Sequence, residues 1–81
     1  MSIILYTTNH CPECNVLKMF LRDYQIDYES KNCSLYPQYW DEVKEYGFLG
    51  VPLTVINGKA IQGFKPEEII KAIEQKETPD A

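Results

Sequence analysis

The sequence has few cysteines, few cations and no long apolar run, and each shortage excludes a class of protein. Its 81 residues include 8 Lys and Arg against 12 Asp and Glu, which gives a net charge of −4. Because nucleic acids and anionic membrane surfaces select clustered cations, we expect neither as a partner. No apolar stretch approaches the roughly 20 residues that cross a bilayer. The opening Met-Ser-Ile-Ile-Leu-Tyr-Thr also lacks the basic start and cleavage site of a signal peptide, so a cytoplasmic protein is expected.

Only three cysteines are present. A secreted scaffold held by disulfides needs more cysteines and usually an even number of them. Two of them form Cys11-Pro12-Glu13-Cys14, and the third, Cys33, stands alone. A structural zinc ribbon needs a second Cys-x-x-Cys pair, which the chain lacks. In a reducing cytosol, a single pair that follows a strand and opens a helix is typical of a redox motif. Cys33 is interpreted as a small, semi-buried hydrophobe at a strand end.

Length and composition indicate one small globular domain, residues 1–81, without repeats or linkers. Apolar periodicity and turn residues predict the order β-α-β-α-β-β-α. Strands are expected at 2–7, 26–31, 53–56 and 60–62. Helices are expected at 12–24, from 37 to about 47, and from 66 onward, and the polar tail at 77–81 is expected to fray.

The predicted helix at 12–24 has apolar residues at the i, i+3 and i+4 spacing of an amphipathic helix. These residues are Val16, Leu17, Phe20, Leu21 and Tyr24. Similar stripes are expected for the second helix, at Tyr36, Tyr39, Trp40 and Val43, and for the last, at Ile69, Ile70 and Ile73. A helical crossover makes the first two strands parallel, and the Asn57-Gly58 turn adds an antiparallel hairpin. The expected fold class is therefore α/β, with a mixed four-stranded sheet and helices on both faces.

The two paired cysteines face different surroundings on the predicted helix. Cys11 points away from the apolar stripe and Cys14 lies at its rim, so one sulfur should be exposed and the other partly covered. Thiol–disulfide exchange uses this asymmetry, because an accessible thiol attacks and a sheltered thiol resolves. Backbone N–H groups and the helix dipole lower the pKa of Cys11, whereas the Glu13 carboxylate raises it, so a moderately depressed pKa is expected. His10 and Lys18 are further cations nearby, but each is more simply an ordinary loop or solvated helix residue.

The motifs together resemble a glutaredoxin, in the thioredoxin-fold superfamily, over nearly the whole chain. They are Cys11-Pro12-Glu13-Cys14, Val51-Pro52, Asn57-Gly58-Lys59 and Gly63-Phe64, in that order. The resemblance implies a thioredoxin-like fold, with Cys11 as the nucleophile and Cys14 as the resolving thiol. It also implies a cis Val51-Pro52 peptide and a substrate segment that pairs with the Val51 backbone in the manner of an added strand. The implied substrate-binding residues are Pro12, Val51, Pro52, Gly63, Phe64 and Lys65.

Two positions depart from the glutathione-using members of this family. Gly50 stands where those members usually carry threonine before Val-Pro. The stretch Gln62-Gly63-Phe64-Lys65-Pro66-Glu67-Glu68 stands where a glycine pair usually precedes the acidic residues that hold the γ-glutamyl end of glutathione. Gly-Phe-Lys-Pro is more similar to the glutaredoxin-like redoxins that serve ribonucleotide reductase and are recharged by thioredoxin reductase.

The resemblance therefore implies a thiol–disulfide oxidoreductase that reduces protein or glutathione mixed disulfides, ribonucleotide reductase among its candidate partners. Its electron donor would be glutathione or thioredoxin reductase. No metal or organic cofactor is required, and a monomer is expected.

Two other functions stay open from the residues alone. Three thiolates, from Cys11, Cys14 and Cys33, suit a metal ion, and two chains sharing Cys11 suit an iron–sulfur cluster. His10, adjacent to Cys11, is poorly placed as a fourth ligand of the same ion. A binding module with incidental cysteines is the third interpretation, and it predicts that Cys11→Ser leaves function intact.

Overall fold

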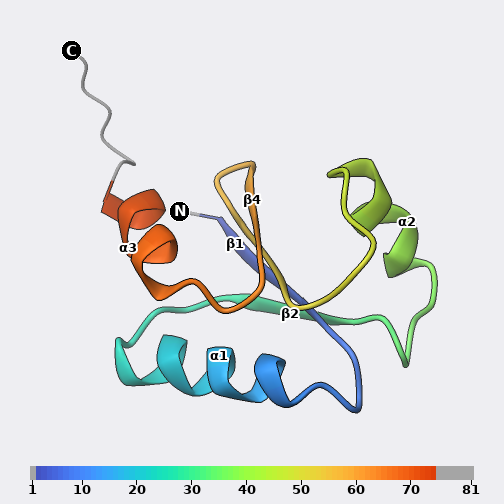
Figure 1. Ribbon diagram of the computed structural model, residues 1–81, viewed down its shortest axis with the longest axis horizontal. Coiled ribbons are helices and arrows are strands. Elements are labelled where there is room, and N and C mark those ends of the chain that lie inside the picture. The colour runs from blue at the N-terminus through green and yellow to red at the C-terminus, as the bar shows by residue number, and fades with distance from the viewer. Residues whose placement is uncertain (1, 75–81) are drawn as a thin grey trace.

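The computed structural model describes residues 2–74 (Figure 1), so the expected frayed tail at 77–81 lies outside the described residues. The elements follow the predicted order β-α-β-α-β-β-α. Their bounds are β1 Ile3–Thr7, α1 Pro12–Asp23, β2 Glu29–Asn32, α2 Tyr39–Glu45, β3 Leu53–Ile56, β4 Lys59–Gln62 and α3 Pro66–Glu74.

The four strands form one mixed sheet in the order β2-β1-β3-β4. β1 and β2 run parallel, with Ile4 opposite Glu29, because α1 carries the chain back across the sheet between them. β3 runs antiparallel to both β1 and β4, and the β3–β4 turn contains Asn57 and Gly58 at positive φ, as this type of hairpin requires. The mixed sheet predicted from the sequence is confirmed.

Side chains alternate between the two faces of the sheet, and each face has its own apolar cluster. Leu5 on β1 packs with Leu17 of α1 and Ile69 of α3, whereas the neighbouring Tyr6 packs with Val43 of α2. Burying a leucine such as Leu17 contributes about 1.5–3 kcal/mol to the stability of the fold. Apolar packing is therefore the main interaction that holds these helices against the sheet. In Figure 1, α2 stands apart from α1 and α3, with the strands between them. The prediction of helices on both faces is confirmed.

β2 departs from the predicted bounds, since it begins at Glu29 instead of residue 26 and ends at Asn32 instead of residue 31. The predicted alternation of Ile26 and Tyr28 is real, but it has another cause. Both side chains are half-buried because they pack against the cluster under α1 and α3 from the connecting segment, before hydrogen bonding to β1 begins.

The helices also differ in detail from their predicted stripes. α2 begins at Tyr39, after Gln38 as N-cap, because Pro37 lies in the preceding turn, and Tyr36 is consequently 53% exposed. Val16 on α1 and Tyr24, the residue that caps the C-terminus of α1, are exposed and lie outside the core. On α3, Ile69 and Ala72 are the buried residues, while Ile70 and Ile73 are half-buried. Within residues 2–74, no helix is long and apolar enough to cross a membrane.

Candidate redox site

The first segment of the site is the start of α1. Pro12 occupies the first turn, where a missing N–H leaves no intrahelical bond unmade, and Cys11 is the N-cap. The backbone N–H of Cys14 donates to the Cys11 Sγ over 3.1 Å, and that of Asn15 donates to the Cys11 carbonyl over 3.2 Å. The Cys11 sulfur therefore lies at the positive end of the helix dipole and takes one of the free N–H groups there.

The two sulfurs of the motif are bonded to each other and differ in exposure. Cys11 and Cys14 form a disulfide with their Cα atoms 5.2 Å apart. Cys14 is only 1% exposed, whereas Cys11 is half-buried. The expected asymmetry is present, although both sulfur-bearing residues are more covered than the helical pattern predicts. An incoming reagent thus meets Cys11 before Cys14.

The second segment is the turn before β3. The Val51-Pro52 peptide is cis, as the resemblance implies, and Pro52 is fully buried while Val51 is half-buried. Among residues 2–74, neither the N–H nor the carbonyl of Val51 takes part in a backbone hydrogen bond. An unpaired backbone of this kind is what strand-like addition of a peptide requires.

The third segment is the loop between β4 and α3, which hydrogen-bonds to both of the others. Gly63 adopts φ +85°, a conformation that side chains rarely allow, and its N–H donates to the Pro52 carbonyl over 2.9 Å. The next N–H, of Phe64, donates to Oε2 of Glu13 over 3.1 Å. The Phe64 ring packs edge-on against Phe20 of α1, with the ring centroids 5.7 Å apart. The structure thereby links three segments that are distant in sequence.

Several of these contacts were not predicted from the sequence. The sequence indicates only the charge of Glu13 beside Cys11, because the bond from Phe64 to Glu13 spans a separation of 51 residues that no local pattern reveals. Gly50 likewise has a specific neighbour, because a Cβ at that position would lie 2.9 Å from Nε2 of Gln62. The Gln62 side chain occupies the space into which a threonine at position 50 would project.

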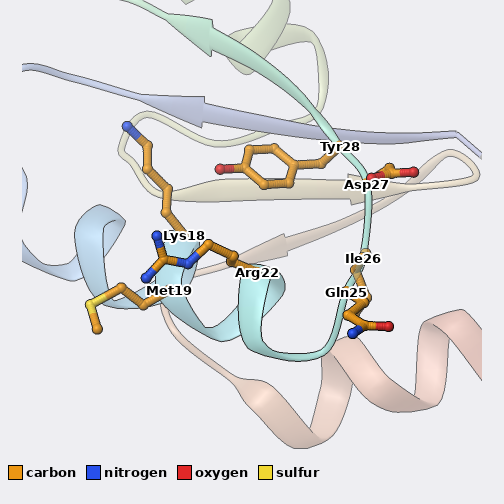
Figure 2. A pocket seen from close by; sticks show the side chains of 7 residues that line it. All are labelled: Lys18, Met19, Arg22, Gln25, Ile26, Asp27 and Tyr28. Atoms are coloured by element: carbon orange, nitrogen blue, oxygen red, sulfur yellow. The ribbon is translucent and has the colours of Figure 1, made fainter.

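The remaining candidate cations are His10, Lys18 and Lys65. His10 is exposed in the loop before α1, and Lys65 is exposed just before α3. Lys18 lines a groove of about 410 Å³ between α1 and the segment that leads to β2. Figure 2 shows Lys18 and Arg22 projecting from α1, with Asp27 and Tyr28 on the adjoining segment. No cysteine lines this groove, so it is separate from the disulfide.

Cys33 is free and only 1% exposed, more deeply buried than predicted, and it directly follows β2. It packs in the α2-side cluster with Tyr6 and Val43, and burial raises the pKa of its thiol. Within residues 2–74, no group of three or more His, Cys, Asp or Glu side chains could hold a metal ion. The described part of the chain therefore does not assemble the three-thiolate site considered from the sequence.

Comparison with known proteins places these features in a family. The glutaredoxin family model matches residues 3–61. A glutaredoxin-like protein NrdH of Lactococcus lactis subsp. lactis is 29% identical over 69 residues, which cover 85% of this chain and 96% of that protein. An uncharacterized glutaredoxin-like 8.6 kDa protein in the rubredoxin operon of Clostridium pasteurianum is 34% identical over 80 residues, covering 90% of this chain and 99% of that protein.

Solved structures agree with this assignment. The glutaredoxin-like NrdH-redoxin from Escherichia coli, whose structure is described as the basis of a thioredoxin-like activity profile, superposes with a TM-score of 0.80 at 27% identity. The match covers 88% of this chain and 93% of that one. The thioredoxin-like protein BC3987 superposes with a TM-score of 0.82 at 26% identity, covering 88% of this chain and 99% of that one.

Proposed function

Because the chain belongs to the glutaredoxin family, we propose that it is a dithiol electron carrier in which Cys11 attacks substrate disulfides and Cys14 resolves the product. One observation carries these roles: the half-buried Cys11 caps α1, while Cys14, bonded to it, is almost fully buried. Only the outer sulfur is open to a substrate, and only the inner one is protected from competing reagents.

The reaction proceeds in two exchanges that balance in sulfur and electrons. The Cys11 thiolate attacks one sulfur of the substrate disulfide, forms a mixed disulfide and expels the other substrate sulfur as a thiolate. The Cys14 thiolate then attacks the Cys11 sulfur, which releases the second substrate thiol and leaves the Cys11–Cys14 disulfide. Two electrons have passed to the substrate. The helix N-terminus and the Cys14 N–H stabilise the attacking thiolate of Cys11.

The substrate segment binds beside the disulfide along the backbone of Val51. Its own N–H and C=O groups pair with those of Val51, which is independent of the substrate's side chains. Pro12 and Pro52 border this path, and Gly63, Phe64 and Lys65 supply its further wall. Such a site accepts protein disulfides of varied sequence.

We assign thioredoxin reductase as the electron donor and ribonucleotide reductase as an acceptor. Two features support this choice over glutathione. The Gln62 side chain fills the space that a threonine at position 50 would occupy in a glutathione-using member. The Phe64 N–H in the β4–α3 loop is already bonded to Glu13. Neither position therefore offers the contacts of a glutathione recess. The thioredoxin-like activity profile of the similar NrdH-redoxin from Escherichia coli supports the same choice. We place the reaction in the cytoplasm, with the chain acting as a monomer of one domain.

Trapping the intermediate tests the roles of the cysteines. Cys14→Ser is expected to accumulate a mixed disulfide at Cys11 with a disulfide-bearing substrate, because the resolving thiol is absent. Cys11→Ser is expected to form none, and Cys33→Ser, which changes a buried thiol outside the pair, should behave as the parent protein. Intact-mass spectrometry after acid quenching measures each adduct. Full turnover by Cys11→Ser would contradict the assignment.

A second experiment tests the donor. Turnover of a disulfide substrate is measured with NADPH and thioredoxin reductase, and in parallel with NADPH, glutathione and glutathione reductase. Thioredoxin reductase is expected to sustain the faster turnover. Turnover sustained only by glutathione would overturn the donor and acceptor assignment while leaving the dithiol mechanism in place.

A further inference from the structure

A carboxylate stands between the two cysteines of the motif and bonds to another segment of the site. Glu13 is exposed in the first turn of α1, and its Oε2 accepts the N–H of Phe64 at 3.1 Å. A Cβ added to Gly63 would lie 3.8 Å from the same oxygen, so the carboxylate lies alongside the 63–64 backbone. This places a fixed negative charge next to the residue that attacks substrate.

The loop at 63–64 suits an anion for physical reasons. The Gly63 N–H donates to the Pro52 carbonyl, whereas the next N–H, that of Phe64, donates to no backbone carbonyl within residues 2–74. The Phe64 N–H is therefore available to an anionic acceptor. α3 begins at Pro66, so the positive end of its dipole lies close by. A substrate carboxylate near its disulfide would find this N–H favourable, but Glu13 already occupies it.

We propose that Glu13 is a specificity-determining residue that selects against anionic disulfides at the Cys11–Cys14 site. Its carboxylate competes for the Phe64 N–H and repels a like charge approaching Cys11. The same bond positions the 63–65 loop against α1. This inference rests on the proposed function, since it concerns which disulfides that site reduces.

The test uses reduced full-length protein and needs no electron donor. Second-order rate constants for oxidation of the dithiol are measured with anionic glutathione disulfide, neutral hydroxyethyl disulfide and cationic cystamine, by acid quenching and thiol alkylation. Each reaction yields two small thiols and the Cys11–Cys14 disulfide. Glu13→Gln keeps a hydrogen-bond acceptor without the charge, and Glu13→Ala removes both. Asp23→Asn is the matched control, because it removes one charge at the other end of α1.

We compare the ratio of the glutathione disulfide rate to the hydroxyethyl disulfide rate, because a general change in Cys11 reactivity cancels from it. Glu13→Gln is expected to raise this ratio about threefold to tenfold at low salt and to lower the matching cystamine ratio, and both effects should shrink at high salt. Glu13→Ala is expected to raise it further and to speed amide hydrogen exchange at Phe64. Asp23→Asn is expected to leave the ratio unchanged.

Each outcome decides something different. Unchanged ratios in both Glu13 variants, with ordinary oxidation of the parent protein, would overturn the selectivity role and leave the dithiol mechanism standing. A ratio that changes equally in Asp23→Asn would overturn it too, since net charge alone would then be the cause. Failure of all three disulfides to oxidise the reduced parent protein would overturn the proposed function itself.

Discussion

Tyr6 on β1 donates a 2.6 Å hydrogen bond from its hydroxyl to the carboxylate of Glu42 on α2. Lys31 of β2 donates to the same oxygen over 2.9 Å and also lies over the rings of Tyr6 and Tyr39. Burial and then the bond to Glu42 raise the pKa of Tyr6, and the bonds from Tyr6 and Lys31 lower the pKa of Glu42. This cluster couples α2 to the sheet through charge as well as packing.

Alkaline pH is expected to destabilise the protein through Tyr6. Because its pKa is raised in the folded state, its contribution is complete below the ordinary value of 10.0 and is lost as the pH rises further. Tyr6→Phe should lower the free energy of unfolding at pH 7 by about 1.5–3 kcal/mol and flatten its decline above pH 10. Urea denaturation from pH 7 to 11 measures this. Tyr24→Phe, on an exposed residue, is the control, and an equal flattening there would contradict the assignment.

Acidic pH is expected to act through Glu42. Its pKa is lowered in the folded state, so its contribution is present above the ordinary value of 4.5 and is lost as the pH falls below it. Glu42→Gln should therefore reduce the stability lost between neutral and acidic pH. Urea denaturation from pH 7 to 3 tests this against Glu45→Gln on the same helix. Identical pH profiles for the parent and Glu42→Gln would show that the bond contributes nothing.

Alkylation of the reduced protein is expected to be strongly selective. Iodoacetamide should modify Cys11 at least about tenfold faster than Cys14 or Cys33, because thiolate character and access both decide reactivity. Both slower cysteines are buried, and burial raises the pKa of Cys33. Peptide mapping by mass spectrometry after timed quenching gives the three rates. Comparable rates at Cys11 and Cys14 would mean that the inner thiol is not protected.

Gly63→Ala is expected to impair the site, because φ +85° is unfavourable for a side chain. The cost should be about 1–2 kcal/mol of stability. Gly47→Ala is the matched control, since Gly47 has φ +91° and no atom within 4 Å of an added Cβ. Both variants should lose similar stability in urea denaturation, but only Gly63→Ala should slow oxidation by disulfides. Equal rates in the two variants would separate the loop from the reaction.

The sequence predicts most of the architecture because local signals agree with the fold. Pro12 at the start of α1, the Asn57-Gly58 turn and the buried run of β3 each depend on nearby residues, and each is confirmed. The family resemblance is confirmed as well. The predicted bounds of β2 are wrong, because its polar residues form a strand only by pairing with β1. A local sequence pattern does not contain that pairing.

The candidate site also has one part that the sequence predicts and another that only the structure reveals. Local chemistry identifies Cys11 and Cys14, and the structure adds the contacts that join them to the rest of the molecule. The bonds from Phe64 to Glu13 and from Gly63 to Pro52 depend on how distant segments meet in three dimensions. Their sequence signals are a lone glutamate and a lone glycine, which have many ordinary explanations.

The polar character of β2 has a consequence for behaviour at high concentration. β2 is an edge strand of four residues, Glu29-Ser30-Lys31-Asn32, and the other edge strand, β4, begins with Lys59. Short edges that carry charge discourage the edge-to-edge pairing of strands from different molecules that leads to aggregation. We therefore expect these charged edges to limit self-association without hindering the strand addition proposed at Val51, which precedes the inner strand β3.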